Sequence, residues 1–467
     1  MASLDTNIVL IALPTIAREL KGTSFFDLLW VLLGYQLVNG SLLVNFGRLS
    51  DMYGRVRLYT FGFALFTAAS ALCSLAQTGE QLIAFRLLQG VGSAFLFSNS
   101  GAIITDAFPE AERGKALGIN QVSLVIGSVL GLVLGGVLTT VAGWQSIFYV
   151  NIPIGIFATA WSHYRLKEVT VIRKGQKIDI LGNITFAGGL ATLLAAITLE
   201  PVSALSPTEF VLLLGLGVSF LVAFVLTERR VKEPMLDLSL FRLRLFNAGM
   251  VASFLNSLAR GAVTLVLTFY LQGPSMGLDA LTAGIFLIPL SLCLAFVGPV
   301  SGYLSDKHGP RLFATSGLVV MMIGFLILAT LGRTTTFWQL AIPLALVGAG
   351  IGLFQSPNRA SVMNSVPARS RGIASGTSVT VLVAGMSFSI GLAFFVLTSS
   401  VPISELQKIF VGGTALDNAP WIDSFITSIH NVYYLSTVFL LLAIIPSALR
   451  GHPRDRGGQN PGELVPE

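Results

Sequence analysis

Long apolar segments alternate with short polar or charged stretches along almost the whole chain. Each segment comes close to the ~20 residues that an α-helix needs to cross a hydrocarbon layer about 30 Å thick. The hydrophobic pattern therefore predicts a succession of transmembrane helices. Fourteen are expected, near residues 3–18, 25–46, 58–77, 80–105, 115–140, 145–163, 180–199, 207–227, 246–272, 279–303, 312–332, 337–360, 372–399 and 425–449.

The composition supports this prediction. Only 11% of the 467 residues are Asp, Glu, Lys or Arg, whereas about 25% are charged in an ordinary soluble protein. Hydrophobic residues make up 53% of the chain, and the mean hydropathy is +0.78. Soluble globular and disordered chains are excluded, because both need far more polar residues. The 48 glycines follow no triplet rule and heptads are absent, which excludes collagen-like and coiled-coil chains. The predicted fold class is an all-α polytopic membrane protein.

The positions of the basic residues predict the orientation of the chain. If Met1 is cytoplasmic, only four of the 29 Lys and Arg residues fall in external loops, and Arg86 and Arg260 lie inside spans. Cytoplasmic loops are normally enriched in Lys and Arg. We therefore expect a multi-pass protein of the cell (plasma or inner) membrane with both termini in the cytoplasm. The net charge of +6 is explained by topology, so no nucleic-acid partner is expected.

The start of the chain has no basic region before its first apolar segment, so the first span is expected to direct membrane insertion without a cleavable signal peptide. That span begins within a few residues of Met1. Either this helix barely crosses the bilayer, or the true start lies upstream. Cys73 and Cys293 both sit in apolar segments, so neither a disulfide framework nor a zinc site is expected.

The chain contains an internal duplication. The segment 47–57 (GRLSDMYGRVR) recurs at 302–311 (GYLSDKHGPR). A second pair of matches follows at nearly the same separation, with Gly92, Ser98, Pro109, Arg113, Gly114 and Gly118 corresponding to Gly350, Ser356, Pro367, Arg371, Gly372 and Gly376. Parallel repeats of this kind are a transporter architecture. The predicted divisions are a six-helix half over 1–164, a basic linker with inserted spans seven and eight and an interfacial segment over 165–244, a second six-helix half over 245–450, and a disordered cytoplasmic tail over 451–467.

The first copy of the repeat resembles the signature loop of the major facilitator superfamily, G-x-L-[AS]-D-x-x-G-R, and the chain is most similar to its fourteen-span drug:proton antiporter branch. The resemblance implies two six-helix bundles plus two inserted helices. It also implies a conformational latch, in which charged side chains at helix ends hold the two halves together in one state. Positive-inside charge on an ordinary turn would explain one arginine but not the second copy. The latch residues are expected to be Gly47, Asp51, Gly54, Arg55, Arg57, Gly302, Asp306, Gly309 and Arg311.

Two further motifs place charge inside the membrane. Residues 4–14 (LDTNIVLIALP) are similar to the branch's first-span motif, with Asn7 and Leu10 departing from it. Residues 82–92 (LIAFRLLQGVG) resemble its fourth-span motif, R-x-x-Q-G-x-G. An ionisable side chain within a span is by default a functional-site hypothesis, and the resemblance implies proton transfer for Asp5 and Arg86. The alternatives are that Asp5 caps a short helix and that Arg86 snorkels to the outer interface.

Arg260 stands near the middle of the ninth span, and no membrane acid lies in its own half. The repeat relates this span to the first, so Asp5 and Arg260 are expected at a similar depth. We predict an Asp5–Arg260 or an Asp5–Arg86 interaction that breaks when Asp5 takes a proton. The alternative for Arg260 is a guanidinium hydrated by the cavity. Asp5, Arg86 and Arg260 are the proton-coupling candidates.

Four glycines of the fifth span, Gly127, Gly131, Gly135 and Gly136, resemble the antiporter motif G-x-x-x-G-P-x-x-G-G. Their spacing forms a smooth face for close helix packing. Leu132 stands where the motif has proline, which weakens the antiport assignment. The following segment 143–155 keeps the branch's frame W-x-x-I-F-x-x-N-x-P-I-G, with Gln145 and Ser146 departing from it.

A polar and aromatic cavity lining is expected from Tyr35, Asn39, Gln89, Phe95, Asn256, Tyr270, Gln355 and Asn358. No phosphate-binding loop, metal-ligand spacing or nucleophile elbow is found, so neither an enzyme nor a cofactor is predicted.

The sequence thus predicts a monomeric, proton-driven exporter of amphipathic or drug-like compounds that works by alternating access. Its partners are the small substrate, protons and the lipid bilayer. Two alternatives stay open: a symporter that takes up a small solute, and a non-transporting membrane sensor built on a transporter fold.

Overall fold

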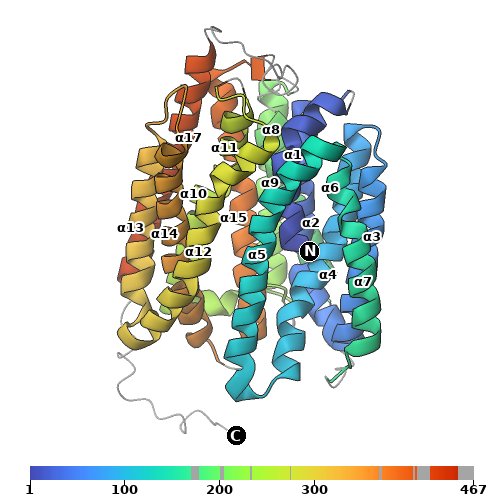
Figure 1. Ribbon diagram of the computed structural model, residues 1–467. Coiled ribbons are helices and arrows are strands. Elements are labelled where there is room, and N and C mark those ends of the chain that lie inside the picture. The colour runs from blue at the N-terminus through green and yellow to red at the C-terminus, as the bar shows by residue number, and fades with distance from the viewer. Residues whose placement is uncertain are drawn as a thin grey trace, which may run out of the picture.

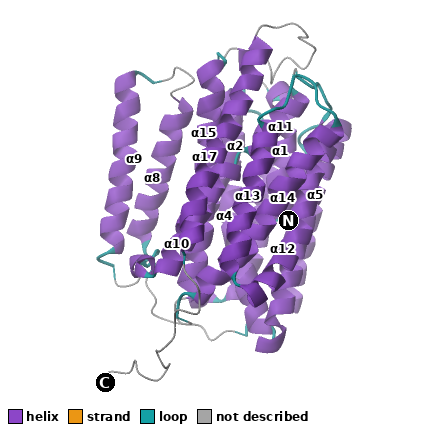
Figure 2. Ribbon diagram, turned by 90° about the vertical axis from the view of Figure 1, so that its left-hand side faces the viewer, coloured by secondary structure: helices purple, strands orange, loops and turns teal. Residues whose placement is uncertain are grey.

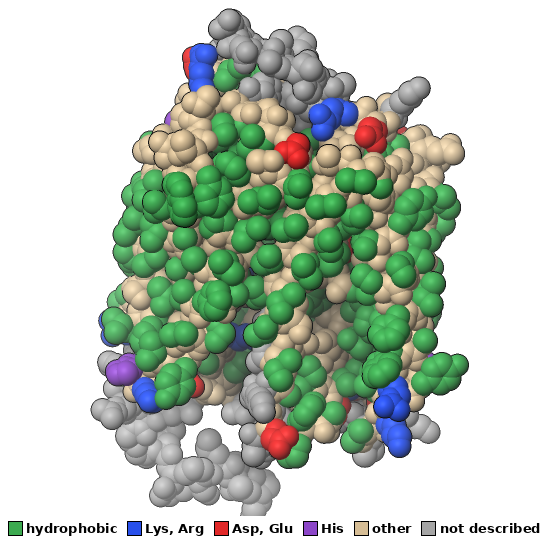
Figure 3. Space-filling model, in the orientation of Figure 1, with side chains coloured by type: hydrophobic (Ala, Val, Ile, Leu, Met, Phe, Trp, Pro, Cys, Tyr) green, Lys and Arg blue, Asp and Glu red, His purple; other side chains and the backbone are tan. Residues whose placement is uncertain are grey.

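The computed structural model describes residues 1–20, 22–169, 178–199, 205–231, 234–273, 275–367, 371–402, 405–406 and 421–450. The predicted tail, 451–467, lies outside this described part. Within it every regular element is a helix, and the helices run side by side along one axis (Figure 1). Hydrophobic side chains cover the middle of the visible face, and charged ones gather toward its two ends (Figure 3). The predicted all-α membrane fold is confirmed.

The first half of the chain forms one group of helices. They are α1 (Ala2–Glu19), α2 (Phe25–Tyr53), α3 (Arg55–Ser74), α4 (Gly79–Ala107), α5 (Glu110–Ala142), α6 (Ser146–Tyr149) and α7 (Asn151–Arg165). The second half forms α10 (Arg244–Arg260), α11 (Val263–Gln272), α12 (Ala280–His308), α13 (Pro310–Leu328), α14 (Phe337–Asn364), α15 (Arg371–Ser400) and α17 (Trp421–Leu449).

Between these groups the chain forms α8 (Ile180–Leu199), α9 (Pro207–Glu228) and a short 3₁₀ helix, η2 (Leu238–Arg242). Helices α8 and α9 pack against each other at the edge of the molecule (Figure 2), and α8 contacts both α2 and α15. The inserted pair is thus attached to both halves through α8. Helices α2 and α9 end, and α8 begins, at the end of the bundle that is lower in Figure 1. We call this end the lower end and the opposite one the upper end.

Twelve helical stretches of the described residues are long and apolar enough to cross a membrane. The predicted spans 3–18 and 145–163 are not among them, although both are helical. The first forms α1, whose 18 residues include the charged Asp5, Arg18 and Glu19. The second is divided between α6 and the 15-residue α7. Pro153 explains the division, because it has no N–H to donate to the carbonyl of Tyr149.

The predicted ninth span is also interrupted, in this case between α10 and α11. The amide of Ala262 donates to the hydroxyl of Ser389 on α15 at 3.0 Å instead of to a carbonyl of its own helix. Gly261 allows the close approach, because a Cβ there would lie 2.7 Å from the carbonyl oxygen of Met386. The break therefore lies where the chain is joined to α15, and Arg260 is the last residue before it.

The two halves touch closely at the upper end through α5 and α12. A Cβ on Gly136 would lie 2.5 Å from the Cα of Leu281, and one on Gly284 would lie 2.5 Å from the carbonyl oxygen of Leu132. Close by, the side-chain amide of Gln272 donates to the carbonyl of Ile11 at 3.0 Å. Backbone-to-backbone contact of this kind leaves no space between the halves at this point.

We expect Gly136→Ala to separate α5 from α12, because backbone atoms cannot move aside as a side-chain end can. Overpacking of this kind costs about 1–3 kcal/mol. The thermal unfolding midpoint of the purified protein should fall. Gly298→Ala on α12 is the matched control, since nothing lies within 4 Å of its added methyl group. Equal midpoints for the two variants would contradict the close contact.

Candidate functional site

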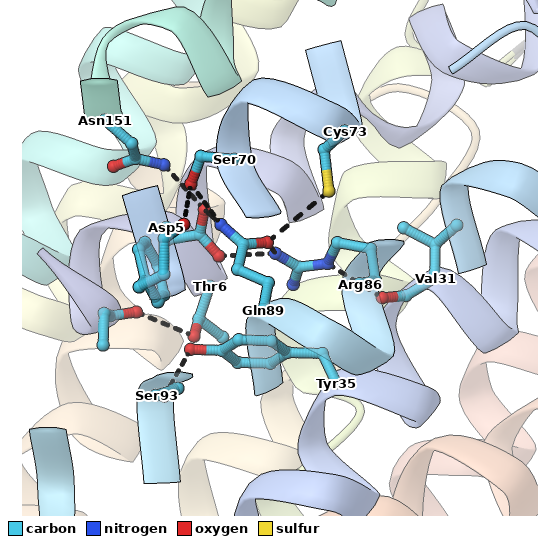
Figure 4. A network of polar contacts seen from close by, with 12 residues as sticks. Asp5, Thr6, Val31, Tyr35, Ser70, Cys73, Arg86, Gln89, Ser93 and Asn151 are labelled. Atoms are coloured by element: carbon cyan, nitrogen blue, oxygen red, sulfur yellow. Dashed lines mark hydrogen bonds and ion pairs between the residues drawn. The ribbon is translucent and has the colours of Figure 1, made fainter. Parts of the chain in front are cut away.

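A buried ion pair lies inside the first group of helices (Figure 4). The Nη1 atom of Arg86 on α4 lies 2.5 Å from Oδ2 of Asp5 on α1, and both side chains are fully buried. Two neighbours donate to the other carboxylate oxygen, Oδ1: the Gln89 amide at 2.9 Å and the Asn151 amide at 2.8 Å. The carboxylate is therefore held by three side chains from α4 and α7.

The Arg86 guanidinium has further partners. Its Nε donates to the carbonyl of Val31 at 3.2 Å, and Nη1 also donates to Oε1 of Gln89 at 2.5 Å. The guanidinium carbon lies 4.1 Å from the ring centroid of Tyr35, an arrangement in which the ring face attracts a cation. The Nη2 atom is buried and has no hydrogen-bond partner among the described residues.

Helix packing explains why the site forms at this place. The side chains of Arg86 and Gln89 are three residues apart on α4, so they lie on the same face of that helix. Helix α1 contributes Asp5, and the start of α7 contributes Asn151 directly after the break at Val150. The site thus joins three helices that are far apart in sequence.

The chemistry of this arrangement follows from the cost of buried charge. A buried ion pair is stable only when its members are paired and hydrogen-bonded, and removing one partner leaves an uncompensated charge. A proton on Asp5 would cancel the carboxylate charge and leave Arg86 as an isolated buried cation. The pair can therefore couple proton binding to a rearrangement of α1 against α4.

Of the two predicted pairings, the structure contains Asp5–Arg86. Arg260 does not join this site. Its Nε donates to Oδ1 of Asn256, one helical turn earlier on α10, at 3.1 Å. Among the described residues, no carboxylate forms an ion pair with Arg260. Its role in proton coupling stays a prediction.

The predicted latch residues of the first copy form an ion-pair cluster at the lower end. The guanidinium of Arg55 lies 2.8 Å from Oδ1 of Asp51 and 2.6 Å from Oδ2 of Asp106. These contacts join α2, α3 and α4 of the first group. Gly54 makes the turn between α2 and α3 possible, because its φ of 105° is unfavourable for other residues. A Cβ added to Gly47 would have nothing within 4 Å, and the Arg57 side chain is exposed.

The second copy repeats the turn but lacks this ion pair. Gly309 has a φ of 87° between α12 and α13, and Gly302 packs against Ser356. In the described part of the chain, neither Asp306 nor Arg311 forms an ion pair. The reason is that Pro310 stands where the first copy has Arg55. The duplicated motif is therefore equivalent in backbone shape and not in charge.

The predicted packing face of α5 is present. A Cβ on Gly127, Gly131 or Gly135 would meet atoms of α1, namely those of Leu4 for the first two and of Ile8 for the third. Gly136 meets α12 instead. The glycines thus place α5 between α1, which carries Asp5, and the other half of the molecule.

The predicted cavity residues fall into separate groups. Gln89 and Tyr35 belong to the Asp5 site, and Tyr35 donates its hydroxyl to Ser93 at 2.8 Å. Asn358 donates to Ser253 at 2.8 Å. Phe95 stacks on Phe46 at 3.9 Å between centroids.

The remaining ones also differ in surroundings. The hydroxyl of Tyr270 donates to the carbonyl of Gly332 at 2.8 Å, near the upper end, so this ring does not line a central cavity. Asn39 is buried with its Oδ1 unpartnered, Asn256 is buried beside Arg260, and Gln355 is exposed.

Sequence reasoning missed several residues of these sites. Asn151 stands in the frame W-x-x-I-F-x-x-N-x-P-I-G, so a signal existed, but no role was predicted for it. Ser70 accepts a hydrogen bond from Gln89 at 2.8 Å, and nothing in the sequence distinguishes it from other serines. The same holds for Asp106. Glu168 accepts from the amides of Arg55 and Val56 at 3.0 and 2.9 Å and so caps α3.

A groove of about 580 Å³ lies between α3 and α7 and contains none of the predicted site residues. Its lining is mostly apolar and is formed by Thr60, Ala64, Thr67, Ala68, Ala71, Ile152, Ile156, Thr159, Ala160, His163 and Tyr164.

A bundle of apolar helices in two similar halves, with a buried ion pair inside one half, is typical of a polytopic membrane transporter. Residues 1–391 match the family model described as Major Facilitator Superfamily. The chain therefore belongs to the major facilitator superfamily.

Relatives of known name agree with this membership. The chain is 34% identical over 398 residues to "Riboflavin transporter RibZ" of Clostridioides difficile (strain 630), and the aligned region covers 85% of this chain and 84% of that protein. It is 31% identical over 415 residues to "Multidrug resistance protein 3" of Bacillus subtilis (strain 168), and that aligned region covers 88% of this chain and 80% of that protein.

Solved structures agree on the fold. An auto-inhibited peptide transporter of the POT family superposes with a TM-score of 0.65 at 14% identity, covering 100% of this chain and 97% of that one. A bacterial homologue of the human lysosomal transporter Spinster gives 0.61 at 16% identity, covering 96% and 95%.

Replacing Asp5 by Asn should leave Arg86 as an unpaired buried cation and lower the free energy of unfolding by about 3–5 kcal/mol. The double variant Asp5→Asn, Arg86→Gln should recover part of this loss, because it removes both charges. Chemical unfolding of the purified protein in detergent measures both effects.

The control is Asp423→Asn, which breaks the solvent-exposed Arg333–Asp423 pair and should change the unfolding free energy very little. The comparison also needs Arg86→Gln alone. If the loss of unfolding free energy in the double variant equals the sum of the losses in Asp5→Asn and Arg86→Gln, then Asp5 and Arg86 are not energetically coupled.

Proposed function

We propose that this chain is a proton-coupled antiporter that exports amphipathic or drug-like compounds, and that it belongs to the fourteen-span drug:proton antiporter branch. In this proposal α1 and the α6–α7 segment also cross the membrane, and with the twelve stretches that are long and apolar enough they make fourteen spans. The transporter is a monomer of the cell membrane with both termini in the cytoplasm, and the lower end faces the cytoplasm. It needs no cofactor, because the proton gradient supplies the free energy.

The single observation that carries this proposal is the fully buried Asp5–Arg86 pair. Asp5 is the acid that can accept a proton inside the membrane, and Arg86 is the cation whose environment changes when it does so. Each proton that moves inward releases ~2.3 kcal/mol per 100 mV of membrane potential. That free energy can drive export only if protonation changes the conformation.

Helix α5 connects the pair with the movement of the two halves. Its glycine face packs on α1 close to Asp5, and Gly136 packs on α12 in the other half. A shift of α1 upon protonation would be transmitted through α5 to the contact with α12 at the upper end. In this proposal the substrate leaves outward while that contact is open, and Asp5 then takes a proton from outside. Protonation closes the contact, and the proton is released to the cytoplasm before the next substrate binds.

Relatives support a drug-like substrate. A multidrug resistance protein of Bacillus subtilis is 31% identical to this chain, and a multidrug resistance protein of Mycobacterium tuberculosis is 32% identical. The substrate site in this proposal lies between the halves, with Arg260, Asn256 and Asn358 as the polar candidates on the second half.

The second candidate is the uptake of a small solute by proton symport. Two observations favour it: the similarity to a protein named as a riboflavin transporter, and Leu132 at the position where the antiporter motif has proline.

The test is transport in proteoliposomes that are acidic inside, with an amphipathic fluorescent dye outside. Protons that leave the lumen should drive the dye inward through an antiporter, and a protonophore should abolish accumulation. In Asp5→Asn the accumulation should fall to the level of empty vesicles.

Glu80→Gln is the matched control, because this carboxylate is exposed in the first turn of α4, the helix that carries Arg86. It should transport like the wild type. Dye accumulation that ignores the gradient would contradict antiport. Riboflavin accumulation in vesicles that are alkaline inside would favour symport instead.

A further inference from the structure

Two buried carboxyl groups meet at the lower end of the inserted helices, away from the Asp5 site. Asp179 directly precedes α8, and Glu228 is the last residue of α9. Each is only 4% exposed. The proposed transport cycle uses neither of them.

Backbone amides bind both groups, but unequally. Asp179 accepts from the amide of Gly182 at 2.7 Å and from that of Met235 at 3.4 Å. Glu228 accepts through Oε2 from the amide of Leu236 at 2.9 Å. The other oxygen of Glu228, Oε1, is buried and has no hydrogen-bond partner among the described residues.

The unpartnered oxygen faces Asp179. A Cβ placed on Gly182 would lie less than 3.0 Å from both Oε1 of Glu228 and Oδ2 of Asp179, so these two carboxyl oxygens lie close together. Two carboxylates at this distance repel each other strongly in a buried site, so both cannot be ionised at low cost. One proton between them removes one charge and supplies the missing hydrogen bond.

We propose that Asp179 and Glu228 form a proton-binding site in which one proton on Glu228 Oε1 is donated to Asp179 Oδ2. The proton belongs on Glu228, because Asp179 accepts two amide hydrogen bonds that favour its ionised form, whereas Glu228 accepts one. The pair titrates as a unit.

The nearby charged group from the packed helix α2 does not neutralise this pair by contact. Arg48 faces it, but the guanidinium donates to the carbonyl of Pro234. In the described part of the chain neither Asp179 nor Glu228 forms an ion pair within 4.0 Å. Among the described residues no cation thus contacts either carboxyl group, and a shared proton can take that place.

The site holds together three parts of the molecule. Asn45 of α2 donates to the backbone carbonyl of Asp179 at 3.3 Å, and Asn183 of α8 donates to the carbonyl of Ser41. Met235 and Leu236 belong to the segment that leads into η2 and the second half. Loss of the proton would place two negative charges at the joint between the first half, the inserted pair and this linking segment, and would loosen it.

The test uses purified full-length protein and infrared spectroscopy at neutral pH. Wild type should show a C=O band of a protonated carboxylic acid that is absent in Glu228→Gln and in Asp179→Asn. Asp5→Asn should retain the band, which separates this site from the proposed coupling site. The same band in wild type and in a folded Glu228→Gln variant would overturn the proposal.

A second measurement follows the thermal unfolding midpoint from mildly acidic to mildly alkaline pH. In wild type the stabilisation by the shared proton is present at acidic pH and is lost as the pair deprotonates, so the midpoint should fall. Glu228→Gln replaces the O–H donor by an amide donor, so this pH-dependent fall should disappear while stability at acidic pH is kept. An unchanged pH dependence in Glu228→Gln would overturn the proposal. A wild-type protein that shows no acid band and is stabilised by added Na⁺ would overturn it as well.

Discussion

The contact between Asp5 and Arg86 has to exist in this form because of the medium that surrounds it. Neither charge can be hydrated inside a bundle of apolar helices, so each stabilises the other, and the remaining hydrogen-bonding atoms require partners of their own. Gln89 and Asn151 meet that requirement for Asp5. This need brings α1, α4 and α7 to one point and determines how they are rotated about their axes. The position of α1 in turn determines that of α5, whose glycines Gly127, Gly131 and Gly135 follow α1 over about two turns of α5.

Small residues and polar residues have complementary tasks in this architecture. Polar side chains define which helices meet, while glycines define how closely they approach. In a membrane, helices gain little from burying apolar surface against one another, because lipid tails are equally apolar. Close backbone contact of the kind seen between Gly136 and Leu281 therefore contributes to association through van der Waals packing. A single methyl group added at such a contact is large compared with the space between the two backbones.

Much of the fold could be predicted from the sequence, because apolar segments of the length of a membrane and a duplicated motif are strong, local signals. The Asp5 site was predicted in part. The two charges stand out in an apolar chain, but their pairing depends on distances between α1 and α4 that no local pattern contains, and Arg260 was an equal candidate. Ser70 and Asp106 were missed, since a serine or an aspartate near a helix end has many ordinary explanations. The breaks after Tyr149 and Arg260 were missed for a related reason. Pro153 marked the first, but Gly261 becomes informative only when α15 lies next to it.

The duplicated turn also has a thermodynamic consequence. Because the two halves are parallel repeats, both copies of this turn lie at the lower end, and two equivalent copies would place an ion-pair cluster in each half at that end. In this chain Arg55 binds two carboxylates in the first half, and Pro310 removes that possibility from the second. The ion pairs of this motif therefore strengthen the lower end in the first half and not in the second, among the residues that the structure describes. Because the Arg55 cluster is partly exposed, dissolved salt screens it, and the strength of the contacts among α2, α3 and α4 should depend on the ionic strength at one face of the membrane only.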